Sequence, residues 1–216
     1  MTGPHQNQPL VTAGVSLEAA EAAVVLVHGR GATARSIVQM TDEFDHDDIA
    51  YLAPQAARNT WYPNAFTAPV ESNEPGRTSG LQAIADAVSK ANEADIPTDR
   101  VMILGFSQGA CLASEFVGRN PTRYGGLAVL SGGLIGEDVA PDDYDGDLAD
   151  TSVFLGCSDV DPHIPEERVR TTADVFERMD ADVTMRLYEG MSHGINEDEL
   201  RAVADLLDGL TRDGSQ

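Results

Sequence analysis

The sequence predicts an α/β domain with a single, mostly parallel sheet flanked by helices. Short aliphatic and β-branched runs alternate with segments of helical periodicity along the whole chain. Several of these runs are apolar on both faces, as strands are when helices cover both sides of a sheet. The length of 216 residues fits one domain, and no internal repeat or low-complexity linker divides it. We therefore expect residues 1–216 to form one domain.

The expected strands are the short apolar runs of the sequence. They are AAVVLV at 22–27, IAYLA at 49–53, VMILGF at 101–106, GLAVLS at 126–131, SVFLG at 152–156 and VTMRLY at 183–188. Residues 1–21 are expected to form either an extension or one more edge strand, built on PLVTAG. At the other end, residues 211–216 are expected to be a disordered tail.

Helices are expected between these strands, at 79–94, 165–180 and 196–210. In the second segment Val169, Ala173 and Phe176 recur at helical spacing, while charged residues occupy the other positions. Asn196 has the residue type of an N-cap, and Glu199 follows it three residues later. In a sheet of this kind, functional residues gather on loops beyond the carboxyl ends of the strands.

The charge of the chain is strongly acidic, with 36 Asp and Glu against 14 Lys and Arg and a net charge of −22. A polyanion repels nucleic acid and anionic lipid, so we expect neither as a partner. Lys90 is the single lysine. Acid excess with so little lysine predicts a haloadapted protein, in which molar salt screens the self-repulsion of the fold.

Other features of the composition indicate a cytoplasmic protein that does not insert into membranes. No apolar run is long enough to span a bilayer, and MTGPHQNQPLVTAG lacks the pattern of a signal peptide. Cys111 and Cys157 lie in apolar surroundings and are expected to be reduced and buried.

The strongest chemical motif is GFSQG, in which Ser107 directly follows the strand at 101–106. A strand, a tight turn and a helix with the pattern GxSxG form a nucleophile elbow. Gly105 and Gly109 are explained by this turn, because side chains there would collide with the neighbouring backbone. The alternative is an N-cap serine between incidental glycines, so the motif needs partners in other loops.

A general base and an acid are available in the expected chain order of serine, acid and histidine. His193 lies in the loop after the strand at 183–188. Asp159 and Asp161 both follow the strand at 152–156. We prefer Asp161, because Pro162 and Pro165 restrict its turn, and we keep Asp159 as the alternative acid. The same loop with His163 could suggest a metal site, but no second ligand cluster supports a metal, and we expect none.

Two backbone N–H groups are candidates for an oxyanion hole. One belongs to Gln108, the residue after the nucleophile, and the other to Arg30 in the glycine-rich turn LVHGRGAT. This turn lacks the spacing of a P-loop or of a dinucleotide fingerprint. For His28, a structural hydrogen bond is the preferred interpretation.

Six ordered motifs resemble the phospholipase/carboxylesterase family of α/β-hydrolases, relatives of acyl-protein thioesterases and of small bacterial carboxylesterases. They are LVHGRGAT, LAPQA with TWYP, LGFSQGACLA, LSGGLIG, GCSDVDPHIP and YEGMSHGINEDE, and the likeness extends from about residue 22 to residue 207. The resemblance implies an α/β-hydrolase fold with Ser107 as nucleophile, His193 as base and Arg30 and Gln108 as oxyanion donors. Its DPxxP turn favours Asp161, whereas its G-x-x-D spacing, counted from Gly156, favours Asp159.

The resemblance also implies that Trp61 and Tyr62 border an acyl pocket. A lone tryptophan could also be part of the core, but we prefer the pocket, because the loop lies at the carboxyl end of its strand. No long insertion supplies a lid domain, so we expect an open pocket for short or medium acyl chains. The predicted function is a cofactor-independent serine esterase acting on a small-molecule ester, with lysophospholipids and thioesters as variants. The alternative from another class is a non-catalytic or very slow ligand-binding protein on the same scaffold. A third possibility is a dienelactone-type hydrolase, but the members of that family carry cysteine at the elbow, where this chain has Ser107. The physiological substrate, and the choice between monomer and homodimer, are left open.

Overall fold

The computed structural model describes residues 3–212, and their strands form one seven-stranded sheet in the order β1-β3-β2-β4-β5-β6-β7. The strands are β1 (Leu10–Gly14), β2 (Ala22–Val27), β3 (Ile49–Pro54), β4 (Val101–Phe106), β5 (Gly126–Leu130), β6 (Ser152–Ser158) and β7 (Asp182–Tyr188). β1 pairs antiparallel with β3, and every other pairing is parallel. The mostly parallel sheet predicted from the sequence is therefore confirmed.

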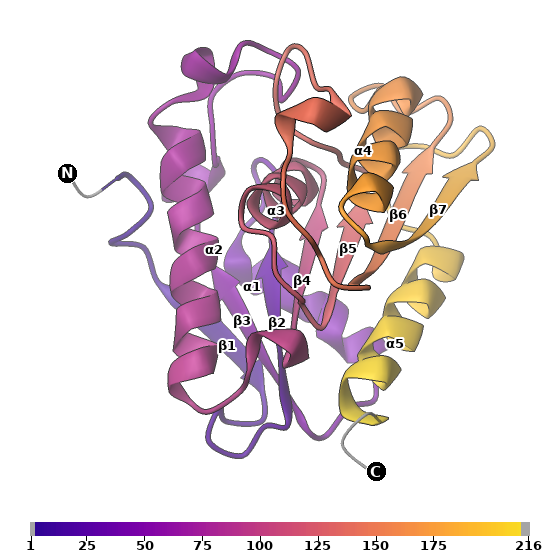
Figure 1. Ribbon diagram of the computed structural model, residues 1–216. Helices are drawn as coiled ribbons and strands as arrows, with labels where there is room; N and C mark the ends of the chain where they lie inside the picture. Colours follow the sequence, from indigo (N-terminus) through magenta and orange to yellow (C-terminus); the bar gives the residue numbers. More distant parts are fainter. Residues whose placement is uncertain (1–2, 213–216) are drawn as a thin grey trace.

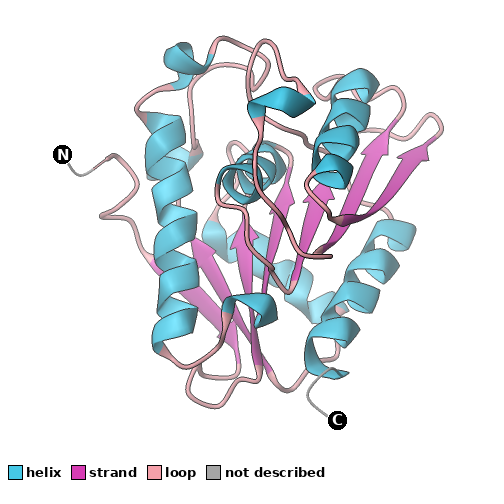
Figure 2. Ribbon diagram, viewed as in Figure 1, coloured by secondary structure: helices cyan, strands magenta, loops and turns pink. Residues whose placement is uncertain are grey.

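Helices cover both faces of the sheet, as Figures 1 and 2 show. They are α1 (Ala34–Val38), α2 (Gly76–Glu93), α3 (Gln108–Arg119), α4 (Glu166–Arg178) and α5 (Glu197–Arg212), with 3-10 turns at Gln39–Glu43, Ala57–Asn59, Val70–Asn73, Thr98–Arg100 and Pro141–Asp143. Side chains of α2, α3 and α4 share one hydrophobic cluster, whereas those of α1 and α5 share the cluster on the other face. The sheet thus lies between two helical layers.

The two ends of the chain refine the expectations from the sequence. Residues 10–14 form the edge strand β1, one of the two alternatives considered for the N-terminal segment. At the other end, α5 continues to Arg212, so residues 211 and 212 belong to a helix rather than to the expected disordered tail. The remainder of that tail, 213–216, lies outside the described residues.

The core explains why the strand sequences are apolar on both faces. Every residue of β2 and β3 is buried, and alternate residues of β2 belong to opposite hydrophobic clusters. Cys111 and Cys157 are both free and buried, as predicted. Burial raises the pKa of each thiol to about 12, so neither is a thiolate at neutral pH.

The strand order locates the part of the sheet where a site is expected. From β2 the chain passes to β3 on one side and later to β4 on the other, and β2 pairs with both strands. Such a reversal leaves a crevice at the carboxyl ends of the two strands. The loop with Arg30 follows β2, and Ser107 follows β4, so the two loops that carry the predicted motifs meet at this position.

Candidate active site

Ser107 lies on a strained turn between β4 and α3. Its backbone has φ 56° and ψ −121°, a conformation that non-glycine residues rarely adopt. A Cβ atom at Gly105 would overlap the backbone of Gly109, and one at Gly109 would overlap the carbonyl oxygen of Val27. The two glycines are therefore required by close backbone packing, as the motif predicts.

Three side chains from separate loops meet at this turn. His193 Nε2 lies 2.9 Å from Ser107 Oγ, and His193 Nδ1 lies 2.7 Å from Asp161 Oδ2. The carboxylate of Asp161 is fully buried, while the imidazole of His193 is 20% exposed. The imidazole of His193 therefore has one nitrogen at the hydroxyl of Ser107 while its other nitrogen is held by a buried acceptor.

Asp161 is held as a carboxylate by its hydrogen bonds. Its Oδ1 accepts from the backbone N–H groups of His163 and Ile164, at 2.8 and 3.1 Å. Burial by itself would raise the pKa of Asp161, but the hydrogen bonds from His193 and these N–H groups outweigh it and lower the pKa. Asp161 therefore remains ionised and can stabilise a protonated His193.

Asp159 follows β6 directly and binds the backbone of the loop that carries His193. Its Oδ1 accepts from the backbone N–H of Gly190 at 2.8 Å, in the loop that carries His193. The neighbouring hydroxyl of Ser158 donates to the carbonyl oxygen of Met191 at 2.6 Å. Asp159 thus connects to the loop of the base without contacting the base, which differs from the role of alternative acid.

The far end of the His193 loop is fixed by a capping box at the start of α5. The backbone N–H of Asn196 donates to Glu199 Oε2 at 2.8 Å, and Asn196 Oδ1 accepts from the backbone N–H of Glu199 at 2.9 Å. Glu199 is fully buried, and burial raises its pKa to about 7. A buried, titratable carboxyl group therefore supports the loop.

Arg30 and Gln108 flank Ser107, where the sequence places the two oxyanion donors. Gln108 is the first residue of α3, and the N–H groups of a first helical turn have no partner within the helix. Both residues line the same cavity as Ser107. The side chain of Gln108 has a role that the motif did not reveal: it accepts from the N–H of Trp61 at 2.9 Å and donates to the carbonyl oxygen of Tyr62 at 2.8 Å.

The cavity beside Ser107 has a volume of about 330 Å³ and opens to solvent. Its wall consists of Arg30, Tyr62, Asn64, Ala65, Phe66, Ser107, Gln108, Cys111, His163, Ile164 and His193. In the described part of the chain no separate lid domain covers it. Phe66, Ile164 and His163 were not identified as wall residues from the sequence, although the motif DPHIP contains two of them.

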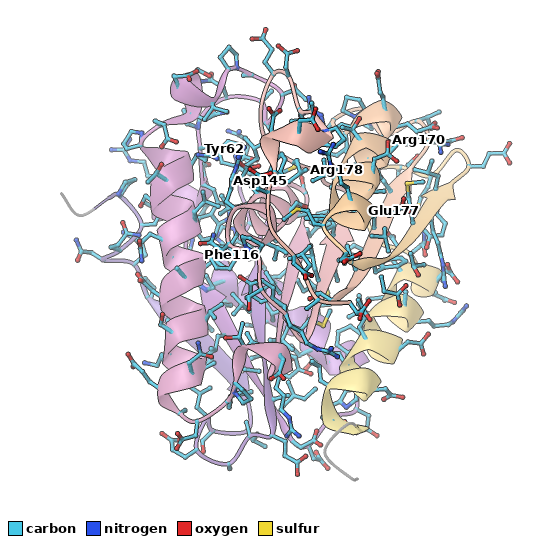
Figure 3. The ribbon with its side chains drawn as sticks, viewed as in Figure 1. Tyr62, Phe116, Asp145, Arg170, Glu177 and Arg178 are labelled. Atoms are coloured by element: carbon cyan, nitrogen blue, oxygen red, sulfur yellow. The ribbon has the colours of Figure 1, made fainter. Side chains whose placement is uncertain are left out.

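The aromatic pair of the TWYP segment divides between the cavity and the core. Tyr62 lines the cavity, and Figure 3 shows it toward the carboxyl ends of the strands, above Phe116 of α3. Trp61 does not reach the wall, which differs from the expectation for it. Its ring is fully buried and its indole N–H donates to the carbonyl oxygen of His28 at 2.8 Å. Trp61 therefore ties the TWYP segment to the end of β2 from within the core.

His28 and His5 support the same loops. His28 Nδ1 donates to the carbonyl oxygen of Gly29 at 2.8 Å, and its Nε2 accepts from the N–H of Ala56 at 3.1 Å. Burial lowers the pKa of His28, which keeps it neutral in this structural role. His5 is also buried, and its Nε2 donates to the carbonyl oxygen of Trp61 at 2.9 Å.

Neither a metal cluster nor a membrane-spanning helix is found within residues 3–212. No three His, Cys, Asp or Glu side chains in this range are arranged to hold a metal ion. None of the helices in the range is sufficiently long and apolar to cross a membrane.

Comparison with known proteins gives one consistent result. The family model of Phospholipase/Carboxylesterase matches residues 15–210. Acyl-protein thioesterase 1 of Candida albicans is 26% identical over 214 residues, which cover 88% of this chain and 93% of that protein. The crystal structure of a phospholipase/carboxylesterase from Dyadobacter fermentans has a TM-score of 0.90 and 39% identity, covering 93% of this chain and 96% of that one.

A second solved structure supports the fold alone. The carboxylesterase of Bacillus cereus has a TM-score of 0.73 at 16% identity, over 95% of each chain. The fold is thus the α/β-hydrolase fold, and the family is one of ester-hydrolysing enzymes. With a matched region that includes all three loops of the site, this chain belongs to the phospholipase/carboxylesterase family.

Proposed function

We propose that this protein is a serine hydrolase that cleaves carboxylic esters of short to medium acyl chains through an acyl-enzyme intermediate. The observation that carries the proposal is the continuous contact from Ser107 through His193 to the buried Asp161, at 2.9 and 2.7 Å, on the wall of an open cavity. The names of the family and of its members favour the same chemistry.

The first half of the reaction forms an ester between the substrate acyl group and Ser107. His193 Nε2 takes the proton from Oγ as the oxygen attacks the carbonyl carbon. The oxyanion that develops is stabilised by the N–H groups of Arg30 and Gln108, and Asp161 stabilises the protonated imidazole. His193 then protonates the leaving alcohol as the tetrahedral intermediate collapses.

The second half hydrolyses the acyl-enzyme. His193 removes a proton from water, which attacks the acyl carbonyl through a second tetrahedral intermediate held by the same two N–H groups. Collapse releases the carboxylic acid and returns the proton to Ser107. No cofactor takes part in this scheme. A cavity of about 330 Å³ suits short or medium acyl chains.

The test is hydrolysis of p-nitrophenyl butyrate by the wild type and by Ser107→Ala, with both folds compared by circular dichroism. We expect turnover by the wild type and its loss in a folded variant. Equal background rates in the two proteins would overturn the proposal and favour a ligand-binding protein on a hydrolase scaffold. A butyryl thioester assayed in parallel separates ester from thioester preference, the latter being suggested by the name of the Candida relative.

We further propose that the protein is cytoplasmic and adapted to high salt, because its net charge is −22 with a single lysine. The assay is therefore made in molar KCl, where the Debye length is about 3 Å and self-repulsion is screened. Dialysis into dilute buffer is expected to reduce both the circular dichroism signal and the activity. An unchanged signal would contradict the adaptation to salt and leave the esterase proposal standing.

A further inference from the structure

The wall of the cavity carries nitrogen donors but no carboxylate. Apart from His193, its titratable side chains include Arg30 and His163, and none of its described residues is Asp or Glu. The chain as a whole has 36 acidic and 14 basic residues. The carboxylate of Asp161, which contacts His193, is fully buried and accepts hydrogen bonds from His193 and from the backbone N–H groups of His163 and Ile164.

The guanidinium group of Arg30 is oriented by the loop opposite it. Its Nη1 donates to the carbonyl oxygen of Pro63 at 2.9 Å and its Nη2 to that of Asn64 at 2.7 Å. These acceptors are neutral, and no ion pair with Asp or Glu involves Arg30 within residues 3–212. Because a guanidinium has five N–H donors, three remain for another partner.

His163 provides a second hydrogen-bond donor. It lies in the loop after β6, and β6 and β2 lie on opposite sides of β4 in the sheet. Its ring packs edge-on against His193, with the ring centroids 5.0 Å apart and the planes at 84°. Its backbone is fixed by the hydrogen bond to Asp161. The imidazole is therefore held on the cavity wall beside the base, without being part of the serine–histidine–aspartate contact.

We propose that the site prefers esters that carry a carboxylate, which Arg30 binds and His163 assists. This inference rests on the proposed ester hydrolysis and adds the class of substrate. An oriented guanidinium with free donors matches a carboxylate in charge and geometry, and its exposure keeps the desolvation cost low. The net charge of −22 repels anions at long range, but molar salt screens that repulsion and leaves contacts within the cavity effective.

The carboxylate could belong to the acyl part or to the alcohol part of the ester, and two pairs of substrates distinguish these sources. The acyl pair is p-nitrophenyl hexanoate and mono-p-nitrophenyl adipate. The alcohol pair is methyl 4-butyryloxybenzoate and 4-butyryloxybenzoate. For each pair, kcat/KM is measured in molar KCl, and the ratio of the anionic to the neutral ester is compared between wild type and variants.

The variants are Arg30→Gln and His163→Leu, and Arg35→Gln is the matched control. Arg35 is an exposed arginine on α1 that does not line the cavity, so its replacement removes the same charge elsewhere. We expect Arg30→Gln to lower the ratio roughly tenfold for one pair, as for loss of a charged hydrogen bond. His163→Leu is expected to lower the same ratio a few-fold, and Arg35→Gln to leave it unchanged. The ratio cancels any effect of the Arg30 variant on the backbone that holds the oxyanion.

A fall of the ratio in the acyl pair assigns the carboxylate to the acyl chain, and a fall in the alcohol pair assigns it to the leaving group. If neither ratio changes while the neutral esters are hydrolysed, the substrate preference is overturned and Arg30 only ties two loops together. A second measurement does not need turnover: monomethyl adipate should raise the Tm of Ser107→Ala more than methyl hexanoate does, and adding Arg30→Gln should remove the difference. Absence of turnover with all four esters, neutral and anionic, would instead contradict the proposed function.

Discussion

Ser107 and His193, the proposed nucleophile and base, are positioned in different ways. Ser107 is positioned by backbone packing. Gly105 and Gly109 have no side chains, so the backbones of β4, α3 and the end of β2 can lie closer together than a Cβ atom would permit. His193 lies in a loop held by polar bonds from Asp159, Ser158 and Glu199.

This difference predicts how each half of the site responds to change. Close packing has no intermediate state, so an added methyl group at the elbow must displace a strand or a helix. Hydrogen bonds between loops can be removed singly, at a cost of about 1 kcal/mol each. We therefore expect abrupt losses at the elbow and graded losses around His193.

The largest effect is expected from Gly109→Ala, because its Cβ would overlap the carbonyl oxygen of Val27. Circular dichroism and the esterase assay should show loss of the folded, active protein. Gly209→Ala is the control, since a Cβ at this position of α5 has no atom within 4 Å. The control should be stabilised by up to about 1 kcal/mol, as alanine favours helix over glycine. A Gly109→Ala protein as active as the wild type would show that close backbone packing does not position Ser107.

The next effect concerns the two aspartates. Asp161→Asn is expected to lower kcat about 10³-fold or more, because the amide no longer holds the imidazole in the required tautomer. Asp159→Ala is expected to lower it only about tenfold, through loss of the bond to Gly190. Asp159→Asn keeps an oxygen acceptor for that N–H and should remain close to the wild type. Larger losses at Asp159 than at Asp161 would reverse the assignment of the acid.

A smaller effect is expected in the pH dependence of stability, through Glu199. Burial raises its pKa from 4.5 to about 7 in the folded protein. Below pH 4.5 the group is protonated in both states, and as the pH rises through 7 the folded state loses up to about 3 kcal/mol relative to the unfolded state. Glu199→Gln should therefore raise Tm by several degrees at pH 8 and change it little at pH 4.

The matched control for this measurement is Glu197→Gln, an exposed residue one position before Asp198 in the same helical turn. It removes the same charge without a buried carboxyl group, so its effect on Tm should be small at both pH values. Equal Tm shifts for the two variants at pH 8 would show that the buried carboxyl group of Glu199 does not cause the pH dependence of stability.

Much of the fold and part of the site could be predicted from local sequence. The six strands expected between residues 22 and 188 are strands in the structure. Five of them are buried along nearly their whole length, whereas the edge strand β7 is only partly buried. The turn at Ser107 was also predictable, since two glycines around a serine between a strand and a helix leave few other conformations. These features depend on neighbours in the chain.

The wall of the cavity and the contacts beneath it could not be predicted from the sequence, because they depend on which side chain faces which loop. Adjacent residues of an irregular loop can point in opposite directions, so Tyr62 reaches the cavity while Trp61 enters the core. The side chain of Gln108 bonds to the backbone N–H of Trp61 and to the carbonyl oxygen of Tyr62. Nothing in a GxSxG motif predicts these two hydrogen bonds.

The sequence by itself determined the alternation of strands and helices, the elbow at Ser107 and the order of serine, acid and histidine, because local sterics and burial periodicity specify them. Only the tertiary structure places Asp161, and not Asp159, in hydrogen-bond contact with His193. The two aspartates are two residues apart in one turn, and a distance of 2.7 Å from His193, 32 residues away, distinguishes them. That distance is set by the pairing of β6 with β7 and by the bonds between their loops, and long-range packing of this kind is not encoded in either segment alone.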